Sequence, residues 1–193
     1  MVVRNFDNII NGYIVGYDPS VAVTENNWLK GVPCLAKNTS GIIYRITQST
    51  YYGNGLFGGS GDSSSNSFTS GQGPRLLLGS NDADEHYNDY KVELIKTLSV
   101  SSYRGVAYST ENGVHRCVLS KTFTNNTAED VIVKEMGVFT DFSGQQSGSS
   151  SVYGTTVLVA REKLAEPVTI PANGGVATFT MNINIPVVDN SAS

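Results

Sequence analysis

The feature that most constrains this chain is the alternation of apolar and polar side chains across residues 176–185. Its apolar positions are Ala177, Phe179, Met181, Ile183 and Ile185, and its polar positions are Thr178, Thr180, Asn182 and Asn184. A period of two predicts a β-strand with one apolar face and one solvated face. Such a strand must bury its apolar face against other elements, so the segment favours the wall of a β-sandwich or barrel.

Short apolar segments separated by turn residues continue this pattern through most of the chain. Strands are expected at residues 75–78, 103–108, 114–124, 131–139 and 155–161, whereas residues 90–98 carry a mixed pattern. Asn112-Gly113 has the signature of a hairpin turn, and the Gly/Ser-rich residues 143–154 are expected to form a long exposed loop. The predicted fold class is all-β: an antiparallel β-sandwich over residues 74–188, with an irregular N-terminal arm, long Gly/Ser-rich loops and a C-terminal tail at 189–193.

Residues 1–73 lack this regular periodicity and are expected to form the N-terminal arm. A brief strand is predicted at 13–17, one helical turn at 25–30 with a stop at Gly31, and another strand at 42–47. We expect the arm to pack on its own sandwich or on a neighbouring subunit, with Tyr13, Tyr17 and Trp28 as assembly contacts. Residues 53–73 are rich in glycine and serine, which favours a flexible linker or a segment ordered by a partner.

The composition narrows the classes of partner. Only 16% of the 193 residues are charged, and the formal net charge is −4. Because the net charge is negative, we do not expect nucleic acid as a partner. We do not expect a membrane either, since no apolar run approaches the roughly 20 residues that cross a bilayer. The N-terminus lacks a basic region followed by an apolar one, so no signal peptide is expected. The two cysteines, Cys34 and Cys117, favour buried reduced thiols over a single disulfide.

No set of residues in the sequence has the spacing of a catalytic or metal-binding site. The acidic residues 81–85, with Asp89 close behind, offer oxygen ligands but lack the spacing of a calcium loop, so a solvated turn is favoured over a metal site. His86 and His115 are far apart, and neither cysteine has a histidine at zinc-ligand spacing. We therefore expect no catalytic residues, no metal, no cofactor and no enzymatic activity.

One pair of charged residues has a specific structural interpretation. Glu135 lies inside the apolar segment 131–139, and Arg161 ends the segment 157–161. If these segments form a hairpin, Arg161 falls close to Val133 and Glu135. We predict a Glu135–Arg161 ion pair that fixes the strand register; two separately solvated charges are the equally weighted alternative.

Three stretches of residues 75–186 carry a resemblance to a known family. They are Leu-Leu-Leu-Gly-Ser at 76–80 followed by Asp-Tyr at 89–90; Ser-Lys-Thr-Phe-Thr-Asn-Asn-Thr at 120–127 followed by Lys-Glu-Met-Gly-Val-Phe at 134–139; and Leu-Val-Ala-Arg at 158–161 followed by Pro-Val-Thr-Ile-Pro-Ala at 167–172. In their order and spacing they resemble a β-sandwich domain that recurs in structural proteins of tailed bacteriophages.

The resemblance implies a non-enzymatic virion component, a tail, neck or capsid-associated subunit made in the host cytoplasm. Its partners would be other virion proteins and copies of itself. The alternative is a carbohydrate- or receptor-binding sandwich at the virion surface that contacts a host glycan. Against that alternative, the single tryptophan, Trp28, lies outside the sandwich segment, whereas sugar sites favour aromatic platforms.

Overall fold

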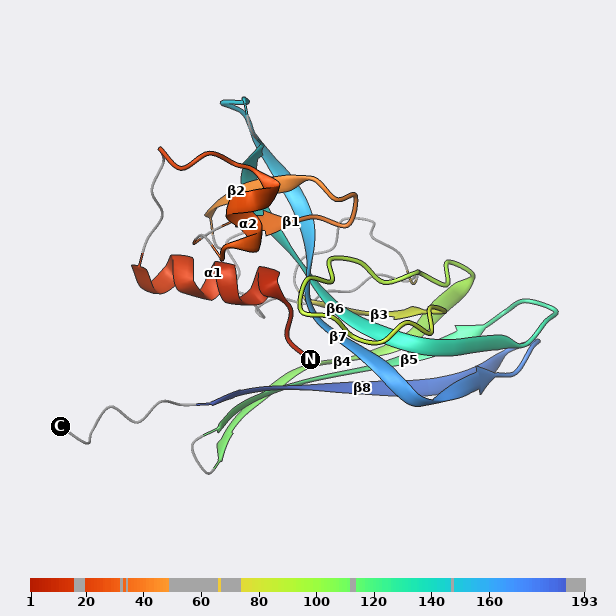
Figure 1. Ribbon diagram of the computed structural model, residues 1–193. Coiled ribbons are helices and arrows are strands. Elements are labelled where there is room, and N and C mark those ends of the chain that lie inside the picture. The colour runs from red at the N-terminus through yellow and green to blue at the C-terminus, as the bar shows by residue number, and fades with distance from the viewer. Residues whose placement is uncertain are drawn as a thin grey trace.

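The computed structural model describes residues 1–15, 20–31, 33, 35–48, 66, 74–111, 114–146 and 148–186. These residues form two helices and eight strands (Figure 1). The helices are α1 (Arg4–Val15) and α2 (Glu25–Leu29), and the strands are β1 (Leu35–Lys37), β2 (Ile43–Gln48), β3 (Arg75–Gly79), β4 (Leu98–Glu111), β5 (Val114–Asn125), β6 (Val131–Gln146), β7 (Val152–Ile170) and β8 (Gly175–Pro186).

The strands form two antiparallel sheets, as the sequence predicts. A five-stranded sheet is built around β6, which pairs with β7 along one edge and with both β3 and β2 along the other, while β1 extends β2. A three-stranded sheet has the order β4-β5-β8. Figure 1 shows β8 and β5 running below β6 and β7, with the helices beside the five-stranded sheet. The prediction of an all-β sandwich is confirmed.

The space between the sheets holds the main apolar core. On β8 the predicted alternation is present: Phe179, Met181 and Ile183 are buried, whereas the polar positions 178, 180, 182 and 184 are exposed. Phe179 meets Phe123 of β5 edge to face, with ring centroids 5.9 Å apart. Leu76, Leu78 and Val138 come from the facing sheet and are fully buried in the same core. Alternation along each strand therefore produces one continuous interior.

The β6–β7 hairpin is longer than predicted, and the expectation of a long exposed loop at 143–154 is wrong. Ser143 pairs with Gly154 and Gly144 with Tyr153, and β2 pairs with β6 on its other edge. Only residues 147–151 lie between the two strands. Backbone hydrogen bonds to two neighbouring strands stabilise this part of β6 despite its weak β-propensity, because propensity in a sheet depends on context. Likewise β4 extends beyond the predicted residues 103–108 at both ends.

The strand expected at 13–17 is also wrong, because residues 13–15 end the helix α1. Phe6 and Ile9 are buried at helical spacing, and tertiary packing of this face overrides the local β-propensity. The side chain of Tyr13 and the whole of Tyr17 lie outside the described part of the chain. The predicted helical turn at 25–30 is present as α2, with Gly31 at φ +76° after it, and the strand predicted at 42–47 is β2.

The described part of the expected arm packs on its own sandwich. β1 and β2 belong to the five-stranded sheet, and Val2 bridges Ala160 of β7. The backbone N–H of Val3 donates to Val159 O at 3.2 Å, and that of Arg161 donates to Met1 O at 2.9 Å. Of residues 53–73, for which a flexible or partner-ordered segment is expected, only Asn66 is described.

Candidate functional site

Charged residues of the sequence-based motifs meet on the outer face of the five-stranded sheet, the face turned away from the three-stranded sheet. A small apolar cluster of Val3, Leu77, Val92, Phe139 and Leu158 is buried there, separate from the main core. Along β6 the outer-face residues have odd numbers from Glu135 to Ser143, because alternate side chains point to opposite faces. Buried ion pairs lie on both sides of this apolar cluster.

The predicted ion pair between Glu135 and Arg161 is present. Arg161 Nε donates to Glu135 Oε2 at 2.7 Å, and the two side chains are 3% and 0% exposed. The register differs from the predicted one, because Glu135 lies opposite Lys163 and Arg161 lies opposite Gly137. The pair is therefore a diagonal contact across the two strands, which is within reach of long side chains on one face.

The ion pair also holds the irregular segment 80–94, which we call the outer loop. Arg161 Nη1 donates to Asp89 Oδ2 at 2.7 Å and to the carbonyl oxygen of Asp84 at 3.0 Å, and Nη2 donates to the carbonyl oxygen of Ala83 at 2.9 Å. The guanidinium has five N–H donors in all. Arg161 thus uses its donors to attach the outer loop to β7.

Glu135 attaches the outer loop from the opposite side. Its Oε1 accepts hydrogen bonds from the backbone N–H groups of Glu93 at 2.8 Å and Asn81 at 3.3 Å. Both ends of the outer loop therefore meet one carboxylate. We call Glu135, Arg161 and Asp89, with these backbone groups, the clasp. Because every charge in the clasp has a hydrogen-bonded partner, the cost of burying the charges is offset within the protein.

Two glycines make room for the clasp. A Cβ on Gly79 would come within 2.3 Å of Val92 Cγ1 and 2.5 Å of Glu135 Oε1. A Cβ on Gly137, the residue opposite Arg161, would come within 2.6 Å of Val92 Cγ2 and 2.9 Å of Leu158 Cδ1. Only glycine lets the outer loop lie this close to the sheet.

The electrostatics of the clasp favour the ionised arginine. Burial by itself lowers the pKa of Arg161, but the hydrogen bonds and charges of Glu135 and Asp89 outweigh burial and raise it above the usual range. At the rim, Lys163 Nζ lies 3.0 Å from Asp84 Oδ1, and this hydrogen bond raises the pKa of Lys163. Asp84 is 95% exposed, so the rim pair contributes little compared with the buried one.

A second buried ion pair lies on the other side of the apolar cluster. Arg75 of β3 is fully buried, and its Nη2 donates to Asp141 Oδ1 of β6 and, at 3.1 Å, to Thr156 Oγ1 of β7. Thr156 in turn donates to the same Asp141 oxygen. This network joins three neighbouring strands, so it links β3 to the β6–β7 hairpin.

Trp28 does not fit the interpretation as an assembly contact. It is 1% exposed, and its Nε1 donates to Asn5 Oδ1 at 3.0 Å. The charged groups of Lys37 and Arg4 lie 4.8 Å and 5.9 Å from its ring centroid. The ring packs inside the chain because a helical turn, α2, folds back against β1, a tertiary contact that the local sequence does not reveal.

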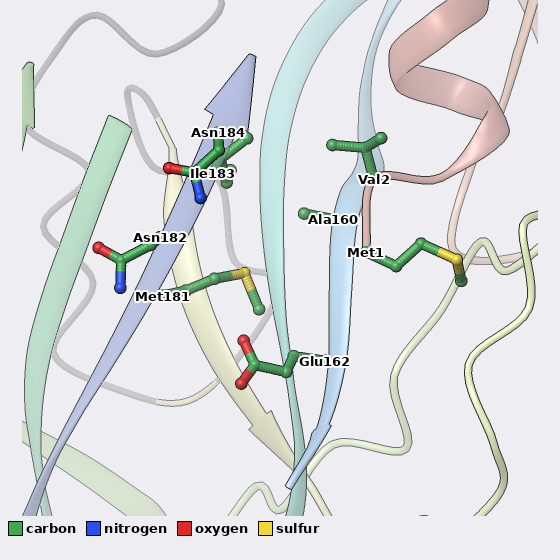
Figure 2. A pocket seen from close by; sticks show the side chains of 8 residues that line it. All are labelled: Met1, Val2, Ala160, Glu162, Met181, Asn182, Ile183 and Asn184. Atoms are coloured by element: carbon green, nitrogen blue, oxygen red, sulfur yellow. The ribbon is translucent and has the colours of Figure 1, made fainter. Parts of the chain in front are cut away.

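A small pocket opens at the edge of the sandwich, between β7 and β8 (Figure 2). It has a volume of about 160 Å³ and is lined by Met1, Val2, Ala160, Glu162, Met181, Asn182, Ile183 and Asn184. Figure 2 shows the side chains of Met181 and Glu162 extending toward each other across it. Burial raises the pKa of Glu162, with a smaller opposing effect of the N-terminal amine.

The other residues considered from the sequence take up structural positions. Asp89 Oδ2 accepts from the backbone N–H of His86, so the acidic segment is part of the outer loop. Among the described residues, no three His, Cys, Asp or Glu side chains are grouped as a metal site. Cys117 is a free, buried thiol whose pKa is raised to about 12 by burial; Cys34 lies outside the described residues. None of the described helices has the length and apolar character needed to cross a membrane.

Sequence reasoning missed the network around Arg75 and Asp141, although a signal for it exists. Asp141 lies six residues after Glu135 on β6, so both side chains are on the same face of the strand. A charged residue on the same face of an apolar segment thus occurs twice. The two buried asparagines of α1, Asn5 and Asn8, carried no comparable signal, because most of their partners are backbone groups of β1, of β7 and of residue 28.

Comparison of the chain with protein-family models, with curated proteins and with solved structures finds no match.

Proposed function

We propose that this chain is a non-enzymatic structural component of a tailed-phage virion, a tail, neck or capsid-associated subunit. It works through protein–protein assembly with other virion proteins and with copies of itself. It is made in the host cytoplasm and ends in the virion.

The observation that carries this proposal is where the residues of the family-like motifs lie. Gly79 and Asp89 belong to the first motif, Glu135 and Gly137 to the second, and Arg161 to the third. All five contribute to the clasp or to the space it needs. The motifs that suggest the family therefore share one structural role: their residues hold the outer loop on the β6–β7 hairpin.

The chemistry of the clasp supports a scaffold more than a catalytic site. A catalytic carboxylate or cation must reach a substrate, whereas Glu135 and Arg161 are almost fully buried and hydrogen-bond to backbone groups of the outer loop. A rigid sandwich that presents loops and edges is suited to repeated contacts, in which many weak interfaces add up.

The proposal is tested by looking for the protein in particles. Virions released by a host that encodes the chain are purified by density gradient, and their proteins are identified by mass spectrometry. The expected result is that peptides of this chain co-purify with the particles in a constant ratio to the major capsid protein. Peptides found in the lysate but lost from the gradient-purified particles would refute a structural role.

A second candidate, a carbohydrate- or receptor-binding module, is favoured by one observation. A polar pocket of about 240 Å³ lies beside the β6–β7 turn, and Arg45, Gln145, Gln146 and Ser149 are among its lining residues. Tyr153, which pairs with Gly144 close by, is 49% exposed and offers an aromatic surface. Amide and guanidinium groups in a small polar pocket suit a sugar.

The same purified protein distinguishes the two functions. A glycan array should give no signal above background if assembly is the function. Saturable glycan binding that Gln145→Ala abolishes would favour the second candidate, provided that Asn126→Ala, at an exposed position outside the pocket lining, leaves it unchanged.

A further inference from the structure

Described segments of the chain lie along parts of each outer edge of the five-stranded sheet. Along β1, the Asn5 amide donates to Lys37 O and accepts from Lys37 N, both at 2.8 Å, and Asn8 Nδ2 donates to Leu35 O at 2.9 Å. In this way asparagine side chains replace the backbone groups of a neighbouring strand. Covered edges cannot pair with another chain.

The edges of β3 and β7 are covered in part. Beyond residue 163, β7 instead carries Glu166 and Pro167, features that block an edge. Asn66 forms a two-way pair with Leu78, accepting from its N–H at 2.8 Å and donating to its carbonyl at 2.7 Å, and the N–H of Ile95 donates to the same carbonyl. Residues 1–3 lie along β7, where Val3 N and Met1 O make the hydrogen bonds described above.

The edge strand β8 is different. It pairs with β5 over twelve consecutive positions without a bulge, and among the described residues no hydrogen bond covers its outer edge. From Gly175 to Ile185 it contains no charged residue and no proline, the features that usually block an edge. Its twelve residues span about 40 Å of open backbone. Figure 1 shows β8 as the outermost strand of the three-stranded sheet.

The other edge of the same sheet, β4, is not comparable. Its pairing with β5 shifts register twice, between Val100 and Ser102 and between Arg104 and Ala107. Bulges bend and twist a strand, which disfavours pairing with a further strand. Among the described residues, β8 is therefore a long, regular edge strand with neither a cover nor a charged residue.

We propose that β8 pairs antiparallel with β8 of a second copy of this chain, about a two-fold axis that passes by Met181. In this register Thr180 lies opposite Asn182 of the second copy, and Thr178 lies opposite its Asn184. On the inner side, Phe179 lies opposite Ile183 of the second copy, and Met181 lies opposite Met181.

The sequence of β8 fits this register and favours a second copy over a foreign strand. Exposed positions 178–184 pair a hydroxyl with an amide, and buried positions 179–183 pair two apolar side chains, so the central part of the strand is complementary to itself. A strand without charge pairs with its own copy without repulsion and offers nothing to recognise a charged partner.

The pocket in Figure 2 supports the same partner. It opens at this edge, and Met181 and Ile183, two of the inner residues of the proposed pairing, line it. Apolar side chains of a second β8 would lie next to this opening, so the pairing would continue the core across the two-fold axis. The result is a six-stranded sheet made of two three-stranded sheets.

This inference rests on the proposed function, because it names a partner for the proposed assembly. A monomeric protein that co-purifies with virions would overturn the inference and leave the function intact. A dimer that is absent from virions would overturn the proposed function and leave the dimer through β8 intact.

The test uses charge substitutions at opposed positions of the full-length chain. Thr180→Lys with Asn182→Lys places lysines opposite lysines across the proposed axis, and Thr180→Glu with Asn182→Glu places glutamates opposite glutamates. The matched control, Ser120→Lys with Thr122→Lys, puts the same charge on the same polar face but on the inner strand β5. Mass is measured by size exclusion with light scattering, and folding by circular dichroism.

We expect the unsubstituted chain and the β5 control to be dimeric and each charged β8 variant to have half that mass. An equimolar mixture of the lysine and glutamate variants should recover the dimer, since every opposed pair then has opposite signs. The inference is overturned by a monomeric unsubstituted chain, by a lysine variant that keeps the dimeric mass, or by folded variants whose mixture stays monomeric.

Discussion

The space between the two sheets and the outer face of the five-stranded sheet are both buried, yet different forces hold them. Between the sheets, apolar side chains at alternate positions pack against one another, as with Phe123 and Phe179, and the buried Lys121 beside Phe123 is an exception. On the outer face, buried ion pairs and backbone hydrogen bonds hold an irregular loop, with a small apolar cluster between the two charged networks. Local periodicity therefore encodes the first region, whereas contacts between distant residues create the second.

The largest expected effect comes from the core between the sheets. Phe123→Ala removes a fully buried ring and should lower the free energy of unfolding by about 4 kcal/mol. Because most of the loss is apolar burial and the contact with Lys121 is also buried, the loss should change little between low and high salt. Urea denaturation measures it, and Val176→Ala, at a position that is 60% exposed on β8, is the control with little expected change. A loss for Phe123→Ala as small as that for the control would contradict this view of the core.

Breaking the clasp should cost slightly less. Arg161→Met leaves Glu135 as an unpaired buried charge, and the expected loss is about 3 kcal/mol. The outer loop should also become sensitive to a protease that cleaves after Glu or Asp, because its attachments to Asp89 and to the carbonyl groups are lost. The control is Lys163→Met on the same strand, whose pairs are partly exposed. Equal losses for the two variants would show that burial of the pair is unimportant.

A steric substitution at the same place should have a smaller effect. Gly137→Ala brings a Cβ within 2.6 Å of Val92, so the outer loop must move, at an expected cost of about 2 kcal/mol. The same substitution in a Val92→Ala background should cost less, because part of the obstruction is gone. The two costs are compared by thermal unfolding, and identical costs would argue against close packing of the outer loop on β6.

The smallest effect concerns Glu162 in the pocket between β7 and β8, where the substitution is expected to stabilise the protein rather than destabilise it. Burial raises its pKa above the ordinary 4.5, so the folded protein binds this proton more tightly than the unfolded chain does. The resulting stabilisation is complete below the unfolded pKa and is lost as pH rises through the folded pKa. Glu162→Gln should therefore raise the melting temperature at pH 7 and leave it unchanged in acid. Glu166→Gln, at an exposed position on the same strand, should leave the melting temperature unchanged at both pH values. A lower melting temperature for Glu162→Gln at pH 7 would contradict this account.

The sequence was sufficient to predict much of the fold. The alternation on β8, the β2 strand and the α2 turn could be read locally, because the side chains that define them are neighbours in sequence. The β6–β7 hairpin was predicted too short, since Gly144 and Ser143 are in strand conformation only because β2 and β7 lie on both sides of them. The helix at 4–15 was missed, because its buried face includes asparagines as well as apolar residues.

The candidate site was predicted only in part. Two charges inside apolar strands were enough to predict the pair of Glu135 and Arg161. The third member, Asp89, lies 46 residues before Glu135 in the chain, and nothing in its surroundings points to a guanidinium. The backbone carbonyl groups that complete the clasp have no sequence signal, since every residue has one.

The most direct test of the difference between the two regions is a double-mutant cycle on Glu135 and Arg161. Glu135→Gln, Arg161→Met and the double variant are unfolded in urea, and the three losses of free energy are compared. The double variant should lose less than the sum of the single variants, because removing both partners leaves no unpaired buried charge. Strictly additive losses would contradict the claim that a buried ion pair holds the outer face together.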